Sequence, residues 1–479
     1  MENFWDSSIW GFIVLLAMIF GSLLLGNALR KSIPWLKQSL IPVSVIGGTF
    51  LLIIAGIYRA ITHDSFFESE ALFAGKGLVY LEMLTYHTLA LGFIASALKN
   101  TNTKLTKKRL GEVVNTGVTT VSTYLMQGAV GLIVCFLVAL VIPNFFVAAG
   151  VLLPFGFGQG TGQAMNYGMI YEGLGFTGGK TFGLTIAAVG FLCASFGGVI
   201  HLNIARKRGK LLQQNDDDAD EIVHGKDVQA PGEIHMQDSV DKLTIQVAFV
   251  AVSYFIAYLI MLGLGNLLPG MRSVIYGFNF LLGVLAAVLV KAILKLFKRT
   301  GMMKKEYTNN FLLTRVSNFF YDIMVVAGIA AIRLDMLQNY WGVLLILAVS
   351  GFVVTYFYNK FVAKKLFPAY YQEQFLAMYG MLTGTASTGV ILLREVDSEF
   401  KTPASDNLVY QNFPAIVLGF PMMLLANLAP EKPVLTLIIF VAFFLVLNFF
   451  LFRSFIFKRK KKGNEDTTSD IAEAVEETE

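Results

Sequence analysis

Long apolar runs alternate with short polar loops along almost the whole chain. Eleven of these runs approach or exceed the roughly 20 residues that an α-helix needs to cross a bilayer. They lie at residues 9–29, 40–57, 78–98, 114–142, 181–203, 243–268, 274–296, 312–332, 341–358, 407–428 and 434–457. The pattern therefore predicts an all-α integral membrane protein with eleven transmembrane helices.

Two further apolar segments, about 145–172 and about 369–393, are interrupted by glycine. Both contain the spacing G-x-x-x-G-T, at Gly156, Gly160 and Thr161 and at Gly380, Gly384 and Thr385. Glycine weakens a helix interior, and non-helical backbone at membrane depth must be enclosed by protein or lined by water. Each segment is therefore either a loop outside the bilayer or a re-entrant hairpin within the protein.

The basic residues decide between these alternatives. Clusters of Lys and Arg follow the first, third, fifth, seventh, ninth and eleventh runs, whereas the loops between them are poor in both. Basic loops face the cytoplasm, which predicts an inner-membrane protein with its N-terminus outside and its C-terminus inside. The alternation holds only if each glycine segment returns to the side it entered, so it favours two re-entrant hairpins.

A polar linker at 205–240, rich in acidic residues, divides the chain. Before it, residues 1–204 hold five runs and the first hairpin, and after it, residues 241–428 hold five runs and the second. An odd number of spans in each half predicts two repeats of inverted topology. A last helix, 429–457, and a charged cytoplasmic tail, 458–479, come in addition.

Composition narrows the function. Hydrophobic residues make up 55% of the chain and charged residues only 15%. The net charge of +5 comes from membrane-flanking loops, so it indicates orientation in the membrane and no nucleic-acid partner. Cys135 and Cys193 both lie within spans, which favours a packing role over a disulfide or a metal site.

Motifs of soluble catalysis are missing from the sequence. The stretch GLGFTGGKT resembles a phosphate-binding loop, but five residues instead of four separate Gly173 from Gly179. Neither H-E-x-x-H nor G-x-S-x-G occurs. We therefore expect no enzyme and no cofactor.

Inverted repeats with broken helices at mid-membrane are typical of secondary transporters. Half-helix N-termini attract anions, while unwound carbonyls and half-helix C-termini coordinate Na⁺. The predicted substrate residues on the two hairpins are Gly158, Gln159, Gly160, Thr161, Gln163, Thr385, Ser387 and Thr388. Gly160 and Gly384 are also candidate sodium ligands. For any one hydroxyl or amide, interhelical packing remains the alternative interpretation.

Ionisable residues within spans are functional candidates by default. Asp322 can bind a cation or accept a proton, and His87 can donate a hydrogen bond to a substrate carboxylate. Inverted repeats would bring these two residues to roughly equivalent positions, although a structural hydrogen bond accounts for either one. Glu82 lies near the start of its span, and Arg394 follows the second hairpin ten residues after Gly384, where a basic residue could attract an anionic substrate. Interfacial anchoring is the simpler interpretation of both.

Residues 155–198 resemble the first re-entrant region of the bacterial sodium:glutamate symporter family. The resemblance lies in Gly158-Gln159-Gly160-Thr161, in EGLGF at 172–176 and in GGKTFGL at 178–184. The second hairpin, GTASTG at 384–389, is less similar. Gln159 stands where the family has His, Ser387 where it has Pro, and the C-terminal span is extra, which marks a divergent member.

The resemblance implies two inverted five-span repeats and sodium-coupled uptake of glutamate or a related carboxylate. It also implies a homodimer that moves a transport domain by an elevator-like shift. A channel-like or proton-coupled exporter of a small organic anion on the same scaffold is the alternative, and dependence on Na⁺ would separate the two.

Overall fold

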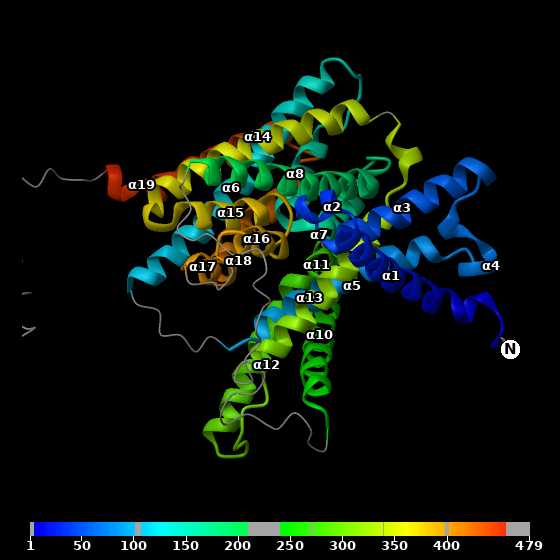
Figure 1. Cartoon of the computed structure of the whole chain (residues 1–479), viewed down its shortest axis with the longest axis horizontal. Coiled ribbons are helices and arrows are strands. Elements are labelled where there is room, and N and C mark those ends of the chain that lie inside the picture. The colour runs from blue at the N-terminus through cyan, green and yellow to red at the C-terminus, as the bar shows by residue number, and fades with distance from the viewer. Residues whose placement is uncertain are drawn as a thin grey trace, which may run out of the picture.

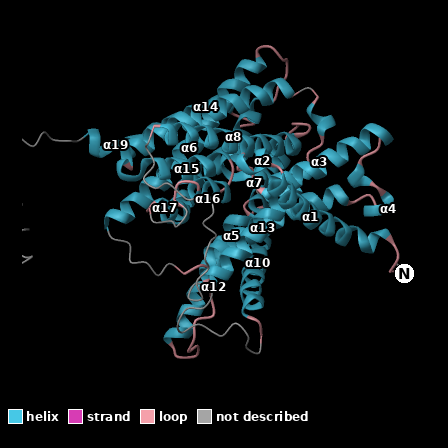
Figure 2. Ribbon diagram, viewed as in Figure 1, coloured by secondary structure: helices cyan, strands magenta, loops and turns pink. Residues whose placement is uncertain are grey.

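The computed structural model describes residues 4–100, 107–208, 240–269, 272–338, 340–397 and 402–456. Within these ranges the chain is helical apart from its connecting loops, and the described residues contain no β-strand (Figure 2). Most of the predicted linker, from 209 to 239, and the predicted tail, 458–479, lie outside them.

The helices follow one another with short connections. In chain order they are α1 (Ser7–Ser32), α2 (Pro34–Gln38), α3 (Val43–Thr62), α4 (Glu70–Phe73), α5 (Gly77–Leu98), α6 (Lys107–Ala139), α7 (Leu152–Gly173), α8 (Gly179–Lys207), α10 (Lys242–Leu267), α11 (Arg272–Gly277), α12 (Asn279–Arg299), α13 (Asn310–Ala330), α14 (Trp341–Leu366), α15 (Tyr371–Thr383), α16 (Ala386–Arg394), α17 (Ala404–Tyr410), α18 (Asn412–Leu428) and α19 (Pro433–Ile456). Short 3₁₀ turns join several of them, among them Val147–Val151 directly before α7.

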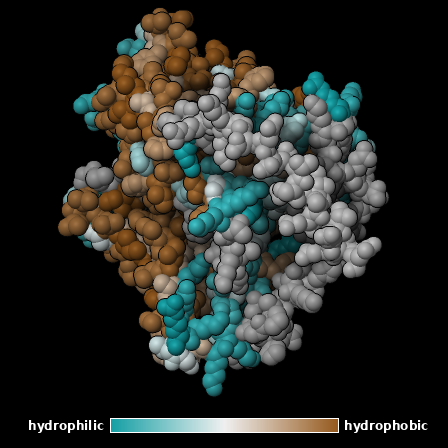
Figure 3. Space-filling model, turned by 90° about the vertical axis from the view of Figure 1, so that its left-hand side faces the viewer, coloured by the Kyte–Doolittle hydropathy of each residue, from teal (hydrophilic) through white to brown (hydrophobic). Residues whose placement is uncertain are grey.

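Ten of these helices are long and apolar enough to cross a membrane. They coincide with ten of the predicted spans, which are thereby confirmed as apolar helices of membrane-spanning length. The remaining prediction, 407–428, falls on α17 and α18, a pair of helices bent by 48° that together satisfy the same test. Hydrophobic residues cover a broad continuous area of the face in Figure 3, as a lipid-facing surface requires. The chain is therefore a multi-pass all-α membrane protein.

The helices pack into two bundles. The first bundle consists of α1, α3, α5, α10, α12 and α13, in which α5 packs on both α12 and α13. The second bundle consists of α6, α7, α8 and α14 to α19, in which α6 packs on α14, α18 and α19. In Figure 1, α1 and α3 lie on the right, α10 and α12 extend downwards, and the second bundle fills the upper left.

The two bundles meet chiefly where α7 packs on α5 and α13. An ion pair also joins them, because Lys180 Nζ at the start of α8 lies 2.7 Å from Glu82 Oε1 on α5. Glu172, in the same bundle as Lys180, lies 3.8 Å from the same ammonium group. Lys180 thus has one acidic partner in each bundle, and Glu82 is held in an ion pair across the contact.

Close backbone contact holds the second bundle together around α6. Gly131 on α6 and Gly150 in the turn before α7 face each other so closely that a Cβ on either would overlap the other's backbone. Backbone atoms cannot rotate away as a flexible side chain can. Small residues permit such contacts between membrane helices, and this one fixes the start of α7 against α6.

Replacing Gly131 with Leu is expected to lower the unfolding temperature of the purified protein. Overpacking a tight contact costs about 1–3 kcal/mol or more, and here the opposing atoms belong to the backbone. Gly21→Leu on α1 is the matched control, because a Cβ at Gly21 has no neighbour within 4 Å. Equal unfolding temperatures for the two variants would contradict this packing.

Candidate functional site

Helix α7 is broken at Gly160. The backbone there has φ 79° and ψ −170°, a combination that glycine adopts without strain. The rings of Phe155 and Tyr167 stack with their centroids 3.8 Å apart, although twelve residues of straight helix would separate them by about 18 Å. The chain therefore reverses at Gly160, and the two halves of α7 lie side by side.

A second break separates α15 from α16 at Gly384 and Thr385. Thr385 is extended, with φ −141° and ψ 172°, and precedes the first residue of α16. A Cβ on Gly380 of α15 would lie 2.8 Å from the Cα atom of Gly389 on α16, so these two helices are also side by side. The two breaks fall on the two G-x-x-x-G-T motifs, where the sequence predicts them.

The two breaks touch each other. We call residues 158–161 the first tip and residues 383–388 the second tip. A Cβ at Gly160 would lie 3.1 Å from Thr385 Cγ2 and 3.9 Å from the carbonyl oxygen of Gly384. Two helical segments begin at this point, one at Thr161 and one at Ala386. The tips thus combine two helix N-termini, with their partial positive charge, in a segment without charged side chains.

The hydroxyl groups of the tips make long polar contacts within the protein. Thr161 Oγ1 donates to the carbonyl oxygen of Met324 on α13 at 3.3 Å. Thr385 Oγ1 lies 3.5 Å from Thr388 Oγ1 within the second tip. Ser387 belongs to α16, but its side chain lies outside the described residues. The first tip therefore contacts the first bundle, whereas the second tip contacts mainly its own.

Helix α6 carries the anchors of both tips. Tyr124 donates its hydroxyl hydrogen to Gly158 O at 3.0 Å. Gln127 Nε2 donates to Leu382 O, at the end of α15, at 2.9 Å. Sequence analysis did not identify these two residues or Met324 as part of the site. The amide of Gln127 in the middle of an apolar run was the signal that could have found one of them.

Two amide side chains of α7 retain hydrogen-bonding capacity. Gln163 is only 1% exposed, and neither its Nε2 nor its Oε1 has a partner among the described residues. Gln159 Nε2 is likewise buried without a partner in that part of the chain. Unpartnered buried polar atoms cost about 1–3 kcal/mol each, which a ligand with its own donors and acceptors would recover.

The two intramembrane ionisable residues lie in the first bundle. His87 is exposed on α5, and its Nδ1 lies 2.6 Å from the hydroxyl of Tyr254 on α10. Asp322 is exposed on α13, about 200° around the helix from Met324, which packs near Gly160. The structure thus brings Gly160, Thr161, Gly384 and Thr385 together and directs Asp322 elsewhere.

The described residues contain no cluster of three or more His, Cys, Asp or Glu side chains that could hold a metal ion. Oxygen atoms of carbonyl, hydroxyl and amide groups are the donors that the tips offer. The sequence matches no protein-family model and no curated protein.

Gly160→Ala is expected to destabilise the protein, because an alanine in this backbone conformation costs about 1–3 kcal/mol and its Cβ would press on Thr385. The measurement is the unfolding temperature of the purified protein. Gly173→Ala, at the last residue of α7, is the control, since a Cβ there meets nothing within 4 Å. An unfolding temperature of G160A at or above that of G173A would show that α7 does not reverse at Gly160.

Proposed function

We propose that the protein is a sodium-coupled secondary transporter that imports glutamate or a related amino acid or carboxylate. The observation that carries this proposal is the contact between two uncharged helix breaks, at Gly160 and at Gly384–Thr385, inside a membrane protein. Broken helices are tolerated at membrane depth where they line a cavity or a binding site.

The composition of the bundles supports two inverted repeats. The first bundle takes three spans from each half of the chain, α1, α3 and α5 from the first half and α10, α12 and α13 from the second. The second bundle takes the next two spans of each half together with the broken helix between them. Each half thus contributes the same series of elements to the same bundles. Because each half contains an odd number of spans, the two series have opposite orientations. Both breaks are then re-entrant hairpins, one from each side.

The chemistry at the tips supports an anionic substrate and a cationic partner. The helix N-termini at Thr161 and Ala386 favour a carboxylate. The adjoining C-terminal ends, at Gln159 and Thr383, present carbonyl oxygens that suit Na⁺. Gln159, Gln163 and Thr388 complete the proposed substrate site, whereas the roles of His87, Ser387 and Asp322 stay predictions.

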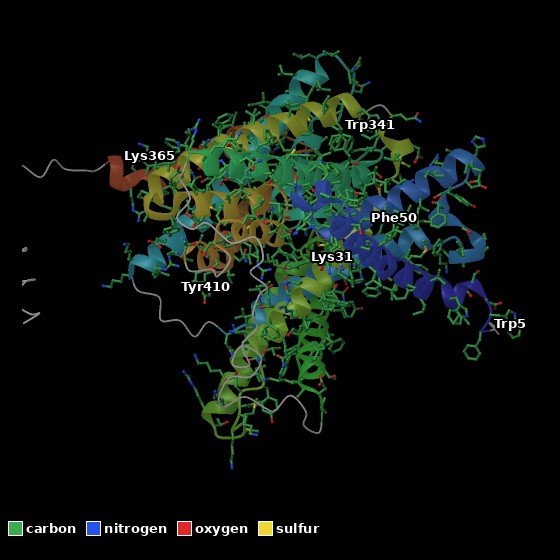
Figure 4. All side chains as sticks on the ribbon, viewed as in Figure 1. Trp5, Lys31, Phe50, Trp341, Lys365 and Tyr410 are labelled. Carbon is green, nitrogen blue, oxygen red and sulfur yellow. The ribbon has the colours of Figure 1, made fainter. Side chains whose placement is uncertain are left out.

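Alternating access follows from the two bundles. The second bundle holds both tips, and it contacts the first chiefly through α7, so displacement of one bundle against the other would carry the site across the membrane. Figure 4 shows Trp341 and Lys365 at opposite ends of α14, and Trp5 and Lys31 at opposite ends of α1. In both helices the C-terminal end is the basic one, which supports an N-terminus outside the cytoplasmic membrane. A homodimer, as in elevator-like carriers, completes the proposal.

Thr161→Val and Thr385→Val are each expected to raise the KM for Na⁺-driven glutamate uptake into proteoliposomes about tenfold, equivalent to about 1.4 kcal/mol. Each change keeps the shape of the side chain but removes its hydroxyl. Thr314→Val is the matched control, because the Thr314 hydroxyl bonds only Asn310 O within α13. Uptake that responds to neither tip variant would refute the assignment of the tips as the substrate site.

Purified protein is expected to be stabilised by its substrate only when Na⁺ is present. A ligand at 100 times its Kd stabilises the folded state by about 2.7 kcal/mol, which thermal denaturation detects. The measurement compares glutamate, other amino acids and dicarboxylates in sodium and in choline salts. Stabilisation that is indifferent to Na⁺, together with uptake abolished by a protonophore, would favour the proton-coupled alternative.

A further inference from the structure

A cluster of polar side chains is buried between α6 and α14, behind the second tip. It consists of Thr123 and Gln127 on α6 and of Thr355 and Asn359 on α14. Asn359 is 1% exposed, and the other three are fully buried. Within each helix the two residues are four positions apart, so they share one face and the two faces meet.

Hydrogen bonds fix the orientation of both amides. Gln127 Nε2 donates to Leu382 O at 2.9 Å and to Thr355 Oγ1 at 2.8 Å. Asn359 Nδ2 donates to Thr355 O at 2.9 Å and to Thr123 Oγ1 at 3.4 Å. A backbone carbonyl only accepts, so each amide must turn its nitrogen towards it and its oxygen away.

The unused hydrogen-bonding capacity of the two amides in this cluster is all of one kind. Gln127 Oε1 and Asn359 Oδ1 are buried and have no hydrogen-bond partner among the described residues. The nitrogen atoms of both amides are already occupied. What remains is a set of neutral oxygens beside Leu382, in the last turn of α15, where the helix carries partial negative charge.

The negative end of α15 favours a cation over a water molecule at these oxygens. A water molecule can donate one hydrogen to each amide oxygen, but a cation is attracted both to these oxygens and to the negative end of α15 beside them. A cation needs only oxygens. Divalent Ca²⁺ and Mg²⁺ are bound with the help of carboxylates, and none of the four side chains is a carboxylate. The chemistry therefore suits a singly charged ion.

We propose that Gln127, Thr355 and Asn359 form a Na⁺ site, with Thr123 and Leu382 O beside it. This proposal rests on the sodium coupling proposed above. It places the ion at these side chains in place of the carbonyl oxygens of Gln159 and Thr383, and away from Asp322, Gly160 and Gly384. Leu382 is two residues from Gly384, and Gln127 bonds its carbonyl. An ion that fixes the Gln127 side chain therefore also fixes the second tip, which couples Na⁺ binding to the substrate site.

The test measures ²²Na⁺ binding by scintillation proximity and the unfolding temperature, on full-length purified protein without substrate. Sodium chloride is compared with choline chloride at constant ionic strength. Wild-type protein is expected to bind Na⁺ and to unfold at a higher temperature in sodium. Gln127→Met and Asn359→Leu, which keep the approximate volume but remove the oxygens, are expected to weaken Na⁺ binding at least about tenfold.

Gln246→Met is the matched control. Gln246 is a fully buried glutamine of the first bundle, and all its hydrogen-bonding groups are occupied, by Lys242 O, Tyr307 O and the Asn309 amide. It is expected to lower the unfolding temperature but to leave the affinity for Na⁺ unchanged. Thr355→Val keeps the shape of the side chain and removes only the hydroxyl. It is expected to weaken Na⁺ binding and covers the case in which the amide changes prevent folding, since wild-type affinity in T355V would also overturn the site.

The outcomes separate this site from the proposed transport function. Wild-type affinity for Na⁺ in Q127M and N359L would overturn the site, even if uptake remains sodium-driven. Absence of any Na⁺ binding by wild-type protein would overturn the site and the sodium coupling together. Na⁺ binding that is lost in Q127M and N359L would support the site, even if uptake of glutamate itself is never observed.

Discussion

The backbone groups exposed by two broken helices must be satisfied within the protein, and much of the second bundle serves that requirement. Lipid offers no hydrogen bonds, so each free N–H or C=O group at membrane depth costs several kcal/mol. Tyr124 and Gln127 satisfy carbonyls next to the two breaks, and α13 receives the hydroxyl of Thr161. Helices α14, α18 and α19 pack around α6 and keep its polar side chains away from lipid.

The contact between the two bundles combines helix packing with an ion pair. It is formed by α7 on α5 and α13, with the pair Glu82–Lys180 at the edge. Both charged groups are partly exposed, so their attraction is modest and screened by salt. Lys180 also keeps Glu172 as a neighbour within its own bundle. If the bundles move relative to each other, the ammonium group therefore need not lose all of its acidic partners.

Hydropathy and glycine spacing predicted most of what depends on local sequence. The spans follow from the length of the apolar runs, and the breaks fall at Gly160 and Gly384 because only glycine or an extended residue interrupts a helix there at low cost. The partners of the breaks depend on which helices meet in space. The position of Asp322 shows this, because a rotation of about 200° between two residues of α13 decides which one approaches the tip.

The role of α6 as the anchor of both tips was the hardest feature to predict from the sequence, although one sequence pattern indicates it. Thr119, Thr123 and Gln127 recur every four residues in a stretch that also holds Thr116, Thr120 and Ser122, which indicates a polar stripe facing protein. A stripe of this kind is compatible with many partners. Only the packing of α14 and α15 against it determines that it supports the second tip and the proposed ion site.

The anchors on α6 have a consequence for the size of whatever lies between the tips. Tyr124 holds one tip and Gln127 the other, and three residues of helix separate them by only about 4.5 Å. Helix α6 therefore sets the distance between the two tips. In the proposed transporter, α6 would then select ligand size, because its side chains hold the backbone behind the tips. A substitution in α6 would change selectivity without changing any residue that touches the ligand.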